Sequence, residues 1–402
     1  MKTSRLSASI LAALLFAAPS PGFAAAAPGW VTSWGTSQQG LSDTKISNAT
    51  ARLIARVTLP GDAVRIRLDN SFGPTPVTFL RATLAPRVRG AGVAPQPVPL
   101  TFAGKDMVTI PAGGSIVSDA ASIRVDAQQD LAISLFVAEA DVQPSQHNNA
   151  QVTSYLTDNG AGDQTTSVDG RMFTGRTNSM FWLKAIDVRT MAPASSIVAF
   201  GDSITDGTCS TLDANDRWED LVAKRLALEN PVRLAIVNEG IGGNTVGNFT
   251  PAPNSPPGVE RLERDVLSHA GVSHVILYMG TNDIRRDATA DQVIAGLKDL
   301  TARIRAKNIR VIGATMVPRH IQVPGVADTF WSAAKNATRA RVNEWIRKEA
   351  GFDAVLDFDA VVRSPENPEL LAPAYNCGDG VHPSPIGYFQ MGKSVDLGIF
   401  RR

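Results

Sequence analysis

The stretch GDSITDG contains one small serine among glycines and aspartates, and GDGVHPSPIGY near the end of the chain contains an aspartate and a histidine. Acyl transfer requires a nucleophile, a base and an acid that orients the base. Ser203 offers the hydroxyl and His382 the imidazole, while Asp379 precedes the histidine by three residues. We therefore predict Ser203, Asp379 and His382 as catalytic residues of a hydrolytic site.

Acyl transfer also needs hydrogen-bond donors for the oxyanion that forms on the attacked carbonyl. NEGIGGN offers the backbone N–H of Gly243, and MGTNDI offers the side-chain amide of Asn282. Together with the N–H of Ser203 they form the predicted oxyanion hole. The structural alternatives are that Gly243 only permits a tight turn and that Asn282 only caps a helix.

Other chemistries at GDSITDG have less support. Ser203 could cap a helix in an ordinary strand-to-helix turn. A phosphate loop would need G-x-x-x-x-G-K-[ST] or G-x-G-x-x-G, and the stretch matches neither. Asp202 and Asp206 are two carboxylates without a nearby histidine, which makes a poor metal site, so no metal is predicted. The G-x-S-x-G elbow of the other large hydrolase class is also absent.

Three further side chains are predicted as substrate contacts. His320 and Trp331 lie in the loop that follows the fourth apolar strand of this half, and Trp218 could add an apolar wall. Trp218 is equally well explained as a core residue of a helix. Of the remaining histidines, His147 lies in the first half of the chain, and His269 and His274 lie near the entry to the third strand.

The second half of the chain has the pattern that would bring these loops together. Nearly all-apolar strands alternate with helical segments, as in a parallel sheet covered on both faces. The expected strands are 195–201, 233–240, 274–280, 310–316 and 354–359. Such repeats predict a flavodoxin-like, doubly wound α/β sheet, in which ligands bind beyond the carboxyl ends of the strands.

The first half has a different pattern. Short segments rich in branched residues are separated by Gly, Pro and Asn or Asp, which predicts an all-β sandwich or jelly-roll-like unit. The expected strands include 51–59, 63–72, 77–85, 122–127 and 130–138. The domain prediction is therefore a β-sandwich-like accessory domain at 28–190 and a catalytic domain at 191–402.

The four blocks GDSITDG, NEGIGGN, GTND and DGVH resemble those of the GDSL-type, or SGNH, esterase and lipase superfamily. Mapped by motif, the resemblance implies Ser203 as nucleophile, Gly243 and Asn282 as oxyanion residues, and Asp379 and His382 as acid and base. It covers roughly residues 195–395, and Ile204 stands where the family name has Leu. The β-rich half resembles the accessory domain that some secreted bacterial members carry.

Only two cysteines occur. Cys209 follows the serine block and Cys377 precedes the Asp/His block, so a disulfide would join the two loops if both lie at one edge of the sheet. Two separate free thiols are the alternative.

The net charge and the N-terminal segment indicate which partners and which cellular location to expect. The net charge is +1, from 39 basic and 38 acidic residues, which leaves no basic field for nucleic acid. Residues 1–27 have the charged, apolar and small-residue regions of a secretory signal peptide. We therefore expect an exported protein, periplasmic or extracellular, with no integral membrane segment.

The sequence thus predicts a secreted serine esterase that forms an acyl-serine and needs no cofactor. The expected substrates are small-molecule or polysaccharide esters, with short acyl groups such as acetyl on carbohydrate. The alternatives are a lipase, arylesterase or transacylase of the same fold, and a carbohydrate-binding protein without catalysis.

Overall fold

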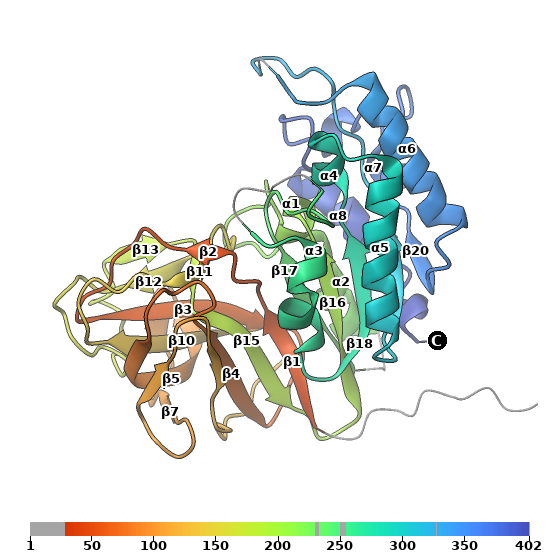
Figure 1. Ribbon diagram of the computed structural model, residues 1–402. Helices are drawn as coiled ribbons and strands as arrows, with labels where there is room; N and C mark the ends of the chain where they lie inside the picture. The colour runs from red at the N-terminus through yellow and green to blue at the C-terminus, as the bar shows by residue number, and fades with distance from the viewer. Residues whose placement is uncertain (1–28, 230–232, 250–254, 327, 402) are drawn as a thin grey trace, which may run out of the picture.

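The chain folds into a β-rich half followed by an α/β half (Figure 1). The computed structural model describes residues 29–229, 233–249, 255–326 and 328–401. The predicted signal peptide lies outside these residues.

The β-rich half contains three antiparallel sheets. The first has the strand order β1 (Trp30–Gly35), β15 (Leu183–Arg189), β4 (Ala63–Asp69) and β9 (Ser115–Val117). The second has the order β13 (Gly175–Thr177), β12 (Ser154–Leu156), β3 (Ala49–Val57), β10 (Gln129–Val137), β5 (Val77–Arg89) and β6 (Gly92–Val93), and its strand β5 also pairs with β7 (Val98–Leu100) and β8 (Val108–Ile110). The third has the order β14 (Met180–Phe181), β11 (Ser145–His147) and β2 (Gly40–Leu41).

The expected strand at 122–127 is wrong. This segment makes only an isolated bridge, between Val125 and Gly61, and a second bridge joins the neighbouring Ala121 to Val64. Val125 and Ala121 are nevertheless buried, so the apolar residues of the segment reflect core packing rather than a ladder.

The α/β half has one parallel sheet with the order β17 (Arg233–Gly240), β16 (Ala194–Gly201), β18 (Val272–Tyr278), β19 (Arg310–Ala314) and β20 (Ala354–Leu356). In chain order this is 2-1-3-4-5, the flavodoxin-like arrangement. The doubly wound fold class is therefore confirmed. The edge where all five strands end is the edge that the sequence singles out for ligands.

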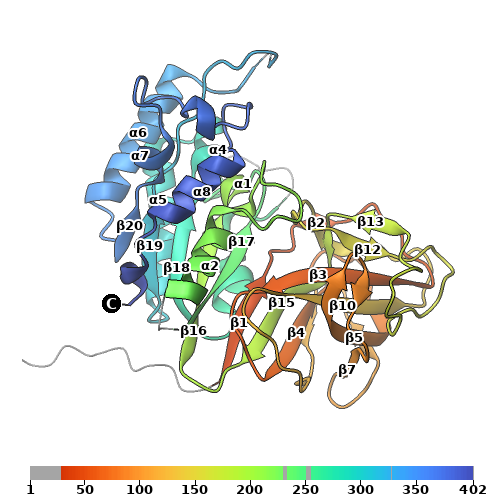
Figure 2. The same ribbon diagram turned by 180° about the vertical axis from the view of Figure 1, so that it is seen from behind.

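Helices cover both faces of the parallel sheet (Figures 1 and 2). Side chains alternate along β16, so that Ile197 and Ala199 join one core and Val198 and Phe200 join the other. The first core includes residues of α2 (Trp218–Glu229), α7 (Phe358–Val362) and α8 (Pro385–Ser394). The second includes residues of α3 (Gly258–Leu262), η1 (Glu263–Leu267), α5 (Ala290–Arg305) and α6 (Ala333–Lys348).

Short elements lie at the carboxyl edge and the C-terminus. They are α1 (Ser203–Asp206), α4 (Thr281–Arg285), η2 (Pro373–Tyr375) and η3 (Leu397–Phe400). One-turn helices carry too little periodicity to be read from sequence.

Buried polar contacts join the two halves. Lys184 Nζ of β15 lies 2.6 Å from Asp265 Oδ1 of η1, and both side chains are buried. Ser37 Oγ donates to Glu239 Oε2 at 2.5 Å. Because these groups are removed from water, the halves meet in a defined geometry rather than across a hydrated gap.

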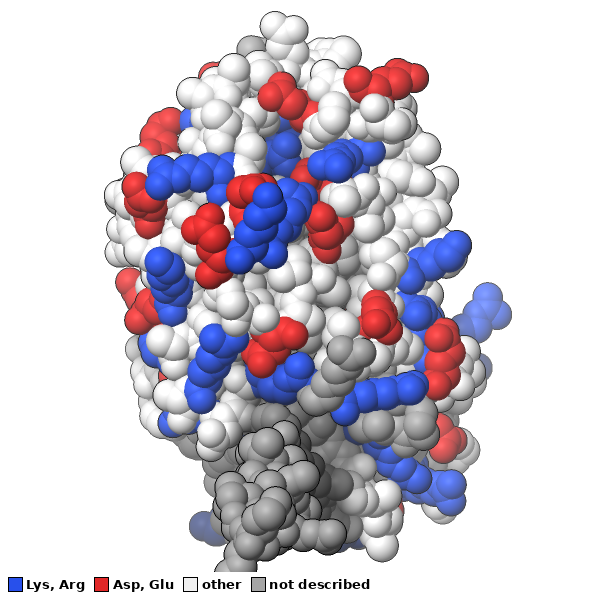
Figure 3. All heavy atoms as spheres, turned by 90° about the vertical axis from the view of Figure 1, so that its right-hand side faces the viewer, with Lys and Arg blue, Asp and Glu red and all other residues white. Residues whose placement is uncertain are grey.

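The surface of the helical side carries both signs of charge. Lys and Arg side chains are interspersed with Asp and Glu on this face (Figure 3), as in the exposed pair between Arg341 of α6 and Asp291 of α5. Among the described residues, no helix has the length and apolar character required to cross a membrane.

Candidate active site

Ser203 stands at the sharp turn between β16 and α1. Asp202 is the N-cap of this helix, and its carboxylate accepts the N–H of Ile204 at 3.1 Å. A Cβ on Gly201 would lie 2.2 Å from Thr205 Oγ1, so the backbone can turn this closely only with glycine here. The turn thus holds Ser203 at the carboxyl edge of the sheet.

His382 and Asp379 come from the loop between η2 and α8. His382 Nε2 lies 2.8 Å from Ser203 Oγ, across a sequence separation of 179 residues. His382 Nδ1 lies 2.5 Å from Asp379 Oδ2, and Asp379 Oδ1 accepts the N–H groups of Val381 and His382 at 2.8 Å each. The three predicted side chains therefore form one hydrogen-bonded series.

The protonation states follow from these contacts. Burial raises the pKa of Asp379, but its hydrogen bonds and the charge of His382 outweigh burial and bring the pKa down to about 2. The ionised carboxylate accepts the hydrogen on His382 Nδ1. In the neutral imidazole Nε2 is then free to accept the hydroxyl proton of Ser203.

The three N–H donors predicted for the oxyanion hole are not all used by the fold. Among the described residues, the backbone N–H groups of Ser203 and Gly243 donate no hydrogen bond. Asn282 Nδ2 donates to Asn244 O at 3.0 Å, which orients the amide and leaves its second hydrogen available. The three groups therefore retain hydrogen-bond donors that the fold itself does not use.

Asp283 holds the loop that carries Gly243, a role that the sequence reasoning missed. Its carboxylate accepts the N–H of Val246 at 2.9 Å and that of Gly247 at 3.2 Å. Burial raises the pKa of Asp283 to about 7, although these bonds work in the opposite direction. The sequence feature that could have identified Asp283 is its position directly after Asn282 in the GTND block.

Two of the three predicted substrate contacts need correction. Trp218 is 0 % exposed and packs against Phe358, with ring centroids 5.2 Å apart, so it is a core residue of α2. Trp331 is 5 % exposed, and its Nε1 donates to Asn336 Oδ1 at 2.7 Å. Both rings are large apolar surfaces that the two helix layers bury, which local sequence does not distinguish from a binding wall.

His320 lies at the expected edge but already has partners. Its Nε2 accepts the N–H of Leu371 at 3.0 Å, and its own backbone N–H donates to Gly380 O at 2.8 Å. Burial lowers the pKa of His320, which favours the neutral ring that this acceptor needs. His320 thus supports the loop that carries Asp379 and His382.

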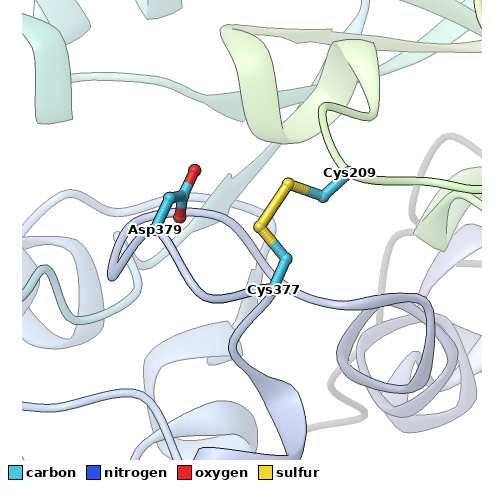
Figure 4. Close-up of side chains that lie close together, drawn as sticks. All are labelled: Cys209, Cys377 and Asp379. Atoms are coloured by element: carbon cyan, nitrogen blue, oxygen red, sulfur yellow. A yellow bond between two sulfur atoms is a disulfide. The ribbon is translucent and has the colours of Figure 1, made fainter. Parts of the chain in front are cut away.

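The two cysteines form a disulfide beside this loop. Figure 4 shows Cys209 bonded to Cys377, with Asp379 nearby. The sulfur atoms and the Asp379 carboxylate lie within 4.8 Å of one another, the one such group with metal-ligand spacing in the described part of the chain. Sulfurs bonded to each other offer no thiolate, so these residues do not suit a metal.

Residues 199–389 match the GDSL-like lipase/acylhydrolase family. The C-terminal half of the chain is a member of the GDSL (SGNH) superfamily. The GDSL-like domain contains all four sequence blocks and the Ser203–His382–Asp379 series. Membership implies hydrolase activity on esters. None of the curated proteins compared with the chain matches it.

Solved structures similar to the GDSL-like domain share low sequence identity with it. A member of the lipolytic protein G-D-S-L family from Veillonella parvula is 21% identical, with 52% of this chain and 100% of that chain covered and a TM-score of 0.39. A carbohydrate acetylesterase family member from Sinorhizobium meliloti is 18% identical, with 52% and 98% covered and a TM-score of 0.42. The aryl esterase of M. smegmatis is 20% identical, with 50% and 96% covered and a TM-score of 0.41.

Proposed function

We propose that the protein is a secreted serine esterase that hydrolyses carboxylic esters through an acyl-serine intermediate. The observation that carries the proposal is the hydrogen-bonded series of Ser203, His382 and Asp379, with separations of 2.8 and 2.5 Å. Such a series activates a hydroxyl by giving it an adjacent, oriented base.

In this mechanism His382 Nε2 takes the proton of Ser203 Oγ as the oxygen attacks the ester carbonyl. The N–H groups of Ser203 and Gly243 and the amide of Asn282 hold the developing oxyanion. The imidazolium then protonates the leaving alcohol, and the acyl group stays on Ser203. Water, activated by the same histidine, releases the acid. No step requires a cofactor.

Short acyl groups on carbohydrate, or similar small esters, are the proposed substrates. The β-rich half and the predicted export suit an enzyme that meets polysaccharide outside the cytoplasm. The disulfide is compatible with an oxidising compartment.

The test is hydrolysis of p-nitrophenyl esters of increasing chain length and of acetylated polysaccharides by the wild type and by Ser203→Ala. We expect acetyl esters to react fastest, and Ser203→Ala to lose at least about 10⁴-fold in kcat. The matched control is Ser122→Ala, because Ser122 is exposed and its side chain forms no hydrogen bond among the described residues. Equal turnover by wild type and Ser203→Ala would refute the assignment.

Two further measurements separate the alternatives. Product analysis with added alcohols or sugars distinguishes hydrolysis from acyl transfer, since a transacylase yields a new ester in place of free acid. A preference for long acyl chains would favour a lipase, and the absence of turnover with every ester would leave a binding protein.

A further inference from the structure

His147 belongs to the β-rich half, yet its side chain lies against the helix that begins with Ser203. It ends β11, and its Nε2 lies 3.0 Å from Asp206 Oδ1, on the last residue of α1. The other oxygen of Asp206 accepts the N–H of Gly242 at 2.9 Å. His147 and Asp206 are 2 % and 5 % exposed.

We propose that His147 is a positioning residue that holds the oxyanion loop at Gly242–Gly243 through Asp206, so that the β-rich half completes the active site of the GDSL-like domain. This inference rests on the proposed esterase function. It assigns the β-rich half a part in the reaction itself.

Among the described residues, the bond from Gly242 N–H to Asp206 is the one hydrogen bond that Gly242 or Gly243 makes, while the flanking Ile241 and Asn244 are held by Gly201 O and Asn282 Nδ2. Gly242 and Gly243 follow one another, and Gly243 has a φ of +74°. A Cβ built on Gly243 would meet no atom within 4 Å, and one on Gly242 would meet only Asp206 Oδ2, at 3.6 Å. Consecutive glycines have more backbone freedom than any other pair. The bond from Asp206 is therefore a main restraint on the peptide that precedes the Gly243 N–H.

Asp206 in turn needs a fixed partner. Helix α1 has only four residues, and so short a helix is marginal without tertiary contacts. His147 is a rigid partner because its Nδ1 lies 2.8 Å from Ser37 O and its ring is buried. A carbonyl only accepts, so Nδ1 bears a hydrogen.

The same contacts show that one proton must lie between His147 and Asp206. Because Nδ1 already bears a hydrogen, the 3.0 Å contact from Nε2 to the carboxylate contains one proton, on either group. With the proton on the imidazole, the bond is charge-assisted.

Docking of the two halves does not depend on this contact alone. Lys184 and Asp265, Ser37 and Glu239, and Arg217 with the carbonyl of Ala150 also join them. A purely structural role for His147 and a positioning role can therefore be separated by experiment.

Two substitutions of His147 each retain one of the two hydrogen-bonding positions of the imidazole. In His147→Asn the amide reaches the place of Nδ1 and can still bind Ser37 O, but the contact to Asp206 is lost. In His147→Gln the amide reaches the place of Nε2 and can still donate to Asp206. The control is His274→Asn, because His274 is also buried but lies at the start of β18, and its Nδ1 bonds Ser273.

We expect His147→Asn to lower kcat by about tenfold, below the 10²–10³ of a deleted oxyanion donor, with KM within about twofold. His147→Gln should recover most of this loss, and His274→Asn should leave kcat as in the wild type. Amide hydrogen exchange of the peptide 239–246 should be faster in His147→Asn only. Wild-type kcat and exchange in His147→Asn, or equal losses in the Asn and Gln variants, would overturn the proposal.

If His147→Asn does not fold, the comparison moves to Asp206→Asn and Asp206→Ala. The asparagine retains an oxygen for Gly242 and an amide for His147 and should retain most activity, whereas the alanine should not; equal activities overturn the proposal.

The proposed function and the positioning role of His147 are overturned by different results. Turnover that survives Ser203→Ala overturns the proposed function, while turnover lost in Ser203→Ala but unchanged in His147→Asn overturns only the positioning role.

Discussion

Removal of the Cys209–Cys377 disulfide should cost stability more than activity. The two cysteines are separated by 168 residues, so the bond closes a large loop in the unfolded chain. For a loop of this length the chain-entropy relation gives about 5 kcal/mol at 25 °C, and measured effects commonly reach about 2–4 kcal/mol. We therefore expect the double variant Cys209→Ser/Cys377→Ser to lose between about 2 and 5 kcal/mol of unfolding free energy.

The activity of the same variant should fall by no more than about tenfold, because a full 1 Å misplacement of reacting groups costs about 10². The loop that carries Asp379 is held without the disulfide. Cys377 N donates to His382 O at 3.1 Å, and Asn376 Oδ1 accepts the N–H groups of Gly378 and Gly380 at 2.9 and 3.1 Å.

Urea unfolding of the wild type, the reduced and alkylated wild type, and the double variant measures this prediction. The last two should lose similar stability, since both lack the cross-link. A loss below about 1 kcal/mol in both would refute the loop-entropy reasoning. A kcat loss above about 10² would refute the view that the loop is held by its own hydrogen bonds.

Two further predictions concern buried or paired carboxylates. Asp379→Asn should lower kcat by about 10⁴, because it removes the charge that orients His382 and stabilises the imidazolium; a loss below tenfold in a steady-state assay would contradict this role. For Glu219, burial and the neighbouring charge of Asp220 raise the pKa well above its usual 4.5. The folded state therefore keeps a proton that the unfolded state releases, and stability declines as pH rises from 4.5 towards the raised pKa. The Tm of the wild type should fall more between pH 5 and pH 8 than that of Glu219→Gln, and parallel Tm profiles would contradict the raised pKa.

The sequence alone determined the class of the second half and the residues worth testing. Apolar runs at the strand period, separated by helical segments, report burial on two faces, and that pattern predicts the parallel sheet and its carboxyl edge. Ser203, Asp379 and His382 could be identified because each lies in a short motif, GDSITDG directly after an apolar strand and DGVH directly before the last α-helix. The two cysteines flank these motifs, which pointed to the pairing that the structure contains.

Only the tertiary structure decided which side chains share a contact. Trp218 belongs to the core because α2 turns that face to the sheet, and His147 meets Asp206 because the two halves dock with β11 beside α1. Periodicity along the chain reports whether a position is buried, but not what lies opposite it. The contact between His147 and Asp206 depends on the docking of the two halves, and the local sequence around either residue does not encode it.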